Sequence, residues 1–235
     1  LLLAYAKNQV QATGNAQNLR LNINAPTLYE IYAGLRGRAY GYLNIQSQPR
    51  LRATTNLAVD NFGFKDLIDM RKLRIVGQLP TSETTPSLLT AKMESLRSGN
   101  REIQQGEISL AGIRKAHLLK VSAQNEKSKF YVQLAGGFNA QNDWLGQIQK
   151  GDFDSLRARL VQRQSAAVVY NSAKADLLIG AHCWMSQQSQ LCFDQPIRVS
   201  KTRGNISFLT QNLDLNDFAA FMPEGLAITG KLNGH

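Results

Sequence analysis

The chain has 235 residues, of which 43% are hydrophobic and 19% are charged, and these proportions exclude an intrinsically disordered chain. No run approaches the roughly 18 apolar residues that a membrane-spanning helix needs. The formal net charge of +10 indicates either that the chain binds an anionic partner or that it simply has a basic surface. We favour the basic surface and expect no nucleic acid partner, because the basic residues are scattered and do not interleave with aromatic ones.

The first residues predict neither a signal peptide nor an anchor. Leu1 to Ala6 is short and has no basic flank before it. The chain starts at Leu1 rather than at Met, so we expect it to be a piece of a longer protein whose anchor or targeting signal lies elsewhere. The first helical segment is expected at Thr27–Ala33, a second at Asn216–Met222, where Pro223 ends the turn, and a weaker candidate at Gly63–Met70.

Alternation of apolar and polar residues is the main signal along the chain, and it predicts strands with one apolar face. The turn-like segments between the runs, such as Gln124–Lys127 and Asn139–Asp143, are typical of hairpins. The alternating runs lie at 51–59, 73–79, 89–93, 108–112, 119–123, 130–134, 144–148, 156–160, 177–179, 197–199 and 206–208.

The fold class that follows is all-β. No long amphipathic helix lies between the strands, so parallel βαβ units are disfavoured and an antiparallel meander is expected. We therefore predict an antiparallel sheet with one long apolar face and only a few short helices to cover it. The chain is treated as one continuous segment, 1–235, with a weak internal repeat between 28–41 and 218–234, both of which end in Gly-x3-Gly.

The two cysteines predict a stapled hairpin. Cys183 and Cys192 flank a polar, turn-like stretch, and a disulfide that closes such a loop contributes roughly 2.5 kcal/mol in the chain-entropy model. A disulfide indicates an oxidising compartment such as a periplasm. The alternative is a pair of reduced, buried thiols, and a metal site is disfavoured because only His182 is adjacent.

No catalytic set is found, so the chain is expected not to be an enzyme and to need no cofactor or metal. Histidine spacings typical of metalloproteases, nucleophile elbows and phosphate loops are absent from the sequence. Asp152 and Asp154 are expected to decorate a turn, and His117 to begin a strand with a satisfied hydrogen bond. Trp144 and Trp184 are either contacts for an acyl chain or anchors at an interface or, as we favour, rings that fill gaps under a sheet.

Several motifs resemble, in their order and spacing, those of the TamB family, the translocation and assembly module subunit. The resemblance covers roughly residues 19–234, with an earlier copy of the last motif at 28–50. It departs from the family at 156–160, which lacks a second Trp. The motifs are the Gly-to-His strand entry at 112–119, the Trp-x-Gly strand at 144–148, the pair Cys183-Trp184 and Leu191-Cys192, and the proline-glycine segment at 221–234.

The resemblance implies a periplasmic segment of a protein anchored in the inner membrane of a Gram-negative bacterium. It implies, as partners, phospholipid, an outer-membrane barrel protein of the TamA type and unfolded outer-membrane protein substrates, including autotransporters. It also implies the shape of the fold: an elongated, curved antiparallel sheet that forms an open, taco-like apolar trough.

The leading hypothesis is therefore a scaffold that carries phospholipid, assists outer-membrane protein assembly, or does both along this groove. The alternatives are a closed β-sandwich or solenoid with a structural or adhesive role, and a hydrolase with a dispersed active site. The candidate groove residues are Leu110, Leu119, Val121, Val132, Leu134, Ile148, Leu177 and Ile179.

Overall fold

A computed structural model describes residues 2–15, 17–47, 52–80, 84–99, 101–155, 159–215 and 229–234. The chain forms two compact units, Leu1–Arg114 and Lys115–His235. Each unit is described by itself below. The expected helix at Asn216–Met222 and most of the repeat copy at 218–234 lie outside the described residues.

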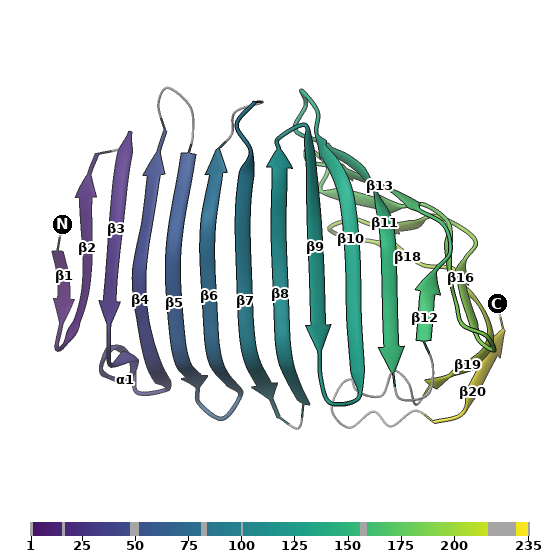
Figure 1. Cartoon of the computed structure of the whole chain (residues 1–235), viewed down its shortest axis with the longest axis horizontal. Helices are drawn as coiled ribbons and strands as arrows, with labels where there is room; N and C mark the ends of the chain where they lie inside the picture. Colours follow the sequence, from purple (N-terminus) through teal and green to yellow (C-terminus); the bar gives the residue numbers. More distant parts are fainter. Residues whose placement is uncertain are drawn as a thin grey trace. The chain divides into compact units, whose positions relative to one another are not determined.

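The first unit is an antiparallel meander in which each strand pairs with the next along the chain (Figure 1). The central strands are 12 or 13 residues long. The strands are β1 (Leu2–Tyr5), β2 (Asn8–Gly14), β3 (Asn18–Ala25), β4 (Leu35–Gln46), β5 (Arg52–Phe64), β6 (Ile68–Pro80), β7 (Ser87–Ser98) and β8 (Arg101–Ile113).

One short helix, α1 (Leu28–Ile31), joins β3 to β4, as predicted for Thr27–Ala33. The second helical prediction in this unit, Gly63–Met70, is wrong. β5 continues to Phe64, and after a turn in which Lys65 has φ 50°, β6 begins at Ile68. The apolar residues Phe64, Leu67 and Ile68 are not spaced by two, and the cause is the hairpin turn at 65–67 that separates the two strands.

The bulge row is the level at which the strand ladders of β4 to β8 pass over one residue in each strand. The register between β4 and β5 shifts by one residue at this level, and the ladders of the later strands are interrupted there. Positive φ angles of 107°, 50° and 47° occur at Gly37, Asn61 and Ser95. The residues of the bulge row are Gly37, Asn61, Arg71, Ser95 and Gln104.

The bulge row changes the phase of the apolar alternation in β5 to β8. Apolar residues of β5 follow at intervals of two up to Val59 and resume at Phe62, and a bulge of this kind returns them to the same side of the strand. Because β5, β6, β7 and β8 all change phase at the same level, the register among these four strands is preserved. Phe62, Met70, Leu96 and Ile103 consequently pair in one apolar row beyond the bulges.

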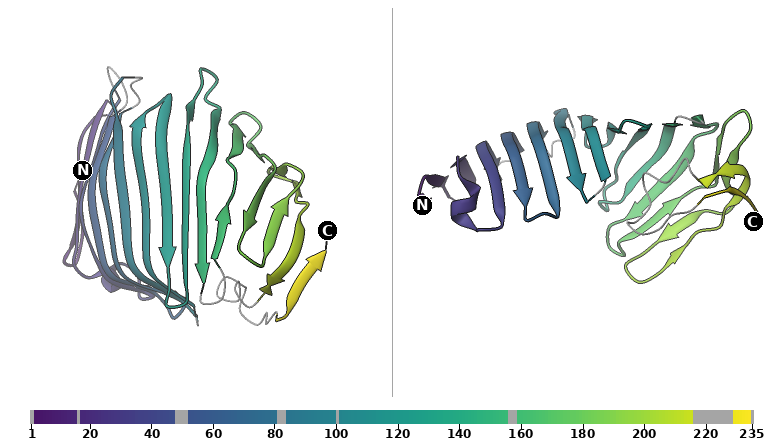
Figure 2. Two further views of the ribbon diagram at one scale, coloured as in Figure 1. Left: turned by 45° about the vertical axis from the view of Figure 1, so that its right-hand side comes forward. Right: turned by 90° about the horizontal axis from the view of Figure 1, so that it is seen from below.

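The second unit is also an antiparallel meander, but its later strands are broken in the middle. β11 pairs with β13 through its first half and with β12 through its second half, and the same split recurs in the strands that follow. In Figure 2 these broken strands are the green to yellow hairpins. The strands are β9 (Ala116–Gln124), β10 (Ser128–Phe138), β11 (Trp144–Ser155), β12 (Arg159–Gln162), β13 (Ala166–Asn171), β14 (Asp176–Ile179), β15 (His182–Met185), β16 (Gln190–Phe193), β17 (Ile197–Val199), β18 (Gly204–Asn205), β19 (Leu209–Asp214) and β20 (Lys231–Gly234).

The predicted turns of this unit are confirmed at two places. Asn125 Oδ1 accepts hydrogen bonds from the backbone N–H groups of Lys127 and Ser128, and Asn139 Oδ1 accepts those of Gln141 and Asp143. Two other predictions are wrong. Asp152 and Asp154 lie within β11 rather than in a turn, and residues 206–208 connect β18 to β19 instead of forming a strand.

The predicted class is confirmed: the fold is all-β, every strand pair is antiparallel, and each unit taken by itself is an open, taco-like sheet. Period-two alternation is responsible, because it gives each strand one face to bury and one to expose. The predicted strand at 156–160 is described from Arg159 onward, as β12. Within the described ranges, no helix has the length and apolarity needed to cross a bilayer.

Candidate functional site: an apolar sheet face

The first unit presents one face that is almost wholly aliphatic. Strand register places apolar residues of successive strands side by side in four rows, and the polar exception, Thr55, donates its hydroxyl to the backbone oxygen of Tyr42 at 3.1 Å. We call this surface the apolar face. Its rows are Leu19, Ile45, Ala53 and Leu79; Ala12, Leu21, Leu43, Thr55, Gly77, Leu89 and Leu110; Val10, Ile23, Gly41, Leu57, Ile75, Ala91 and Ile108; and Ala25, Ala39, Val59, Leu73, Met93 and Gly106.

The apolar face is not covered by other described residues of this unit. Among those residues, Ala25 and Ala58 are the buried apolar ones. Leu43, Leu57 and Ile75 at the centre of the face are only half-buried, and Ile108 is 48% exposed. A continuous aliphatic surface in this state is typical of an interaction site.

The opposite face of the same sheet is polar and holds ion pairs between neighbouring strands. These ion pairs link neighbouring strands on the polar face but contribute little to the free energy of unfolding, because exposed pairs are worth roughly 0–1 kcal/mol. The pairs and their N–O distances are Arg38–Asp60 at 3.7 Å, Lys72–Glu94 at 3.3 Å and Lys92–Glu107 at 3.4 Å.

The candidate groove residues of the second unit fall on one face of its sheet. Register aligns Leu119 with Leu134 and Ile148, and Val121 with Val132. Leu177 and Ile179 on β14 complete a packed cluster with Val132, Leu134 and the buried residues Ile148, Ala166 and Val168. Leu110, the remaining candidate, lies on the apolar face of the first unit.

Each of the two tryptophans lies against glycine on this face. An added Cβ atom on Gly146 or Gly136 would stand 2.6 Å from the indole of Trp144, and one on Gly151 would stand 2.2 Å from that of Trp184. Trp144 Nε1 donates a hydrogen bond to His117 Nε2 at 2.8 Å. His117, the second residue of β9, therefore has the hydrogen bond predicted for it, and it holds the indole of Trp144 in place.

A second cluster in this unit is one that the sequence pattern did not predict. Phe153, Leu160 and Leu213 are buried together, and Trp184 packs against them with Phe130, Leu191 and Leu232. Phe153 and Leu160 stand opposite each other on β11 and β12. The polar interval of β11, Gln149 and Lys150, hid the signal, because a register shift there moves the apolar residues from even to odd positions.

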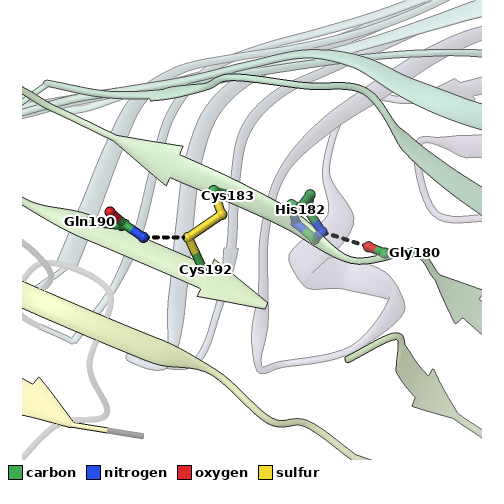
Figure 3. Close-up of a disulfide and its surroundings, with 5 residues drawn as sticks. All are labelled: Gly180, His182, Cys183, Gln190 and Cys192. Carbon is green, nitrogen blue, oxygen red and sulfur yellow. Dashed lines mark hydrogen bonds between the residues drawn. A yellow bond between two sulfur atoms is a disulfide. The ribbon is translucent and has the colours of Figure 1, made fainter. Parts of the chain in front are cut away.

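The predicted disulfide is present. Cys183 on β15 and Cys192 on β16 are directly opposite each other and bonded across the hairpin (Figure 3). Gln190 Nε2 lies 2.8 Å from Cys192 Sγ. The neighbouring His182 is buried, stacks on Phe193 with ring centroids 4.8 Å apart, and places Nδ1 2.8 Å from the oxygen of Gly180.

The paired carboxylates of β11 have a structural environment. Arg159 on β12 pairs with Asp152 through two guanidinium nitrogens, with Nε 3.0 Å from Oδ1. The Asp152 carboxylate, first through this hydrogen bonding and then through its charge, raises the pKa of the Arg159 guanidinium above its ordinary value. In the part of the chain that the structure describes, no three His, Cys, Asp or Glu side chains are grouped as metal ligands.

Comparison with known proteins shows the family to which the chain belongs. The family model for the N-terminal domain of TamB matches residues 1–235. The chain belongs to the TamB family. TamB of Haemophilus influenzae, the translocation and assembly module subunit, is 27% identical over 227 residues, which cover 92% of this chain and 17% of that protein. The chain thus spans about a sixth of the length of this TamB relative, and no solved structure matches it.

Membership of the TamB family confirms the resemblance inferred from the motifs. The name of the relative describes that protein as a subunit of a translocation and assembly module. Among the described residues of its own unit in this TamB segment, none covers the apolar face.

Proposed function

We propose that this segment belongs to a non-enzymatic, periplasm-spanning scaffold that carries phospholipid along the apolar face. The observation that carries the proposal is the half-exposed state of the apolar face over successive strands of the first unit. An acyl chain placed there gains roughly 0.8 kcal/mol for each CH2 removed from water. Because the rows present aliphatic groups without polar anchors, one position along them resembles the next, and a bound tail is free to slide.

The flat indoles of the second unit support the same role. Trp144 and Trp184 lie against glycines, are half-buried and pack among apolar neighbours. Leu119 and Val121 next to them are half-buried. The candidate groove residues of this unit thus form a surface of the same chemistry, although Ile148 is largely covered by its neighbours at 8% exposed.

The proposed setting follows from the family. We place the segment in the periplasmic part of a protein anchored in the inner membrane, with an outer-membrane barrel of the TamA type as partner. The name of the relative, a translocation and assembly module subunit, supports a role in assembly. We propose that outer-membrane proteins and autotransporters are what it helps to assemble. An unfolded outer-membrane strand is the alternative cargo, because its alternating apolar residues match the same surface.

Photocrosslinking tests the proposal with matched pairs of positions. A photoreactive residue is placed at Leu57 or Val121, on the apolar surfaces, and at the adjacent Asn56 or Lys120, whose side chains point to the other side. After irradiation in cells that make the full-length protein, attached lipid is identified by mass spectrometry. Phospholipid attached at Leu57 and Val121 but not at their neighbours supports the proposal. Equal capture on both faces, or capture of peptide alone, contradicts it.

A further inference from the structure

A hollow on the polar face of the first unit brings two arginines together among uncharged polar side chains. It has a volume of about 400 Å³ and lies where β2 to β5 begin or end. Register places its polar side chains on one side of the sheet, opposite the apolar face. They are Thr13, Asn18, Arg20, Asn44, Gln46, Arg52 and Thr54.

Arg20 and Arg52 have no acidic partner among the described residues, and neither has Arg74, which lies on the same face outside the hollow. Arg38, Lys72 and Lys92 on the same face each have an acidic partner within 4 Å. Among the described residues that line the hollow, none is acidic. Arg20 is exposed, and its Nε donates a hydrogen bond to Asn22 Oδ1 at 3.3 Å. Among the described residues this is its one hydrogen bond, so four of its five N–H donors remain for another acceptor.

The floor of the hollow also carries unsatisfied hydrogen-bonding capacity. Asn44 lies between Arg20 on β3 and Thr54 on β5, and its Nδ2 is 3.4 Å from the Thr54 hydroxyl. Its buried Oδ1 has no hydrogen-bond partner among the described residues. Asn44 lines the hollow, and its Nδ2 group carries a second hydrogen besides the one directed at the Thr54 hydroxyl, which adds a donor between the arginines.

From this arrangement we infer that Arg20, Arg52 and Asn44 form a binding site for a phosphate group. Guanidinium groups bind phosphate through paired N–H donors, and an amide and a hydroxyl complete the set of uncharged donors that such a site uses. The group comes either from a phospholipid headgroup or from a free phosphate. The site lies on the opposite side of the sheet from the proposed lipid-carrying surface, so neither depends on the other.

Titration of the 235-residue chain tests the site. Inorganic phosphate and the soluble short-chain lipid dihexanoylphosphatidylglycerol are each followed through the backbone amide signals of Asn44 and Thr54. The double variant R20Q/R52Q is expected to lower the affinity for the bound probe at least about tenfold, because it removes two charged hydrogen-bonding groups. The control R74Q/R198Q removes the same charge from exposed arginines outside the hollow and is expected to leave the affinity unchanged.

Each outcome decides the inference. Binding of both probes with equal affinity supports a site for free phosphate, and binding of the short-chain lipid alone supports a headgroup site. If neither probe binds, or if both double variants lower the affinity equally, the inference is overturned. The crosslinking at Leu57 and Val121 reports on the apolar surfaces, so its failure leaves this result unaffected, and the reverse also holds.

Discussion

Arg36 on β4 reaches Asp69 on β6 by crossing the backbone of Gly63 on the intervening strand. Arg36 Nη2 lies 2.9 Å from Asp69 Oδ1, and Arg97 Nη2 on β7 lies 3.5 Å from the other oxygen. A Cβ atom on Gly63 would stand 2.7 Å from Arg36 Nε. The missing side chain therefore lets one carboxylate on the polar face join two arginines.

Replacement of this glycine should have a small effect. In Gly63→Ala the new methyl group displaces only the mobile end of Arg36, so the free energy of unfolding should fall by at most about 1 kcal/mol, the worth of an exposed ion pair. Denaturant unfolding measures it. In the background of Arg36→Ala the loss should disappear, and a loss that persists there shows that Gly63 acts through the backbone instead.

Gly41 on the apolar face should be far less tolerant. Its φ is 134°, and a Cβ atom would stand 1.9 Å from the backbone oxygen of Asn56. Gly41→Ala should therefore lower the free energy of unfolding by about 2–4 kcal/mol through backbone strain and overpacking. Gly230→Ala serves as the control, because its φ is 114° but nothing lies near the added atom, and it should cost only about 1 kcal/mol. Equal costs at both sites contradict the importance of the close approach.

Reduction of the disulfide should destabilise the second unit. Cys183 and Cys192 close a loop with a sequence separation of 9 residues, so its loss should lower the free energy of unfolding by roughly 2.5 kcal/mol. Thermal unfolding with and without a reducing agent measures this. The double variant Cys183→Ser, Cys192→Ser should match the reduced protein and no longer respond to the reagent. A wild-type midpoint that the reagent leaves unchanged contradicts the prediction.

The apolar face should bind a dye that reports exposed apolar surface, and a charge at its centre should weaken that binding. Ile75→Asp places a carboxylate among half-buried aliphatic neighbours and should reduce dye fluorescence while changing the free energy of unfolding by no more than about 1–2 kcal/mol. The matched control is Arg74→Asp on the opposite face. If both variants bind the dye equally, the apolar face is not the surface that the dye detects.

The pKa of Glu30 offers a local test of the α1 region. The Thr27 hydroxyl hydrogen bond lowers this pKa, partial burial opposes it, and the Lys7 backbone N–H and charge lower it further. Since the folded-state pKa is depressed, the stabilisation is present above the unfolded-state pKa and is lost as pH falls through the folded-state value. Titration by NMR should give a midpoint below the ordinary range for Glu, and Thr27→Val should raise it. An unchanged midpoint in that variant contradicts the assigned cause.

Much of the fold was predictable because alternation reports burial directly. The runs at 53–59 and 73–79 became strands of the apolar face, and the groove candidates from Leu119 to Ile179 share one face of the second unit. Irregular spacing defeated the same logic: the hairpin turn at 65–67 resembled a helix, and the register shift near Gln149 concealed the core around Phe153. The hollow between Arg20 and Arg52 could not be predicted, because it depends on which residues of four strands stand side by side.

The bulge row implies that the strands of the first unit cannot lengthen or shorten independently. Loss of Asn61 alone would rotate the end of β5 by half a turn and send Phe62 and Phe64 to the charged side, while β6 kept its orientation. A tolerated insertion or deletion at this level must therefore be matched in the adjoining strands, so the lengths of neighbouring strands are expected to change together.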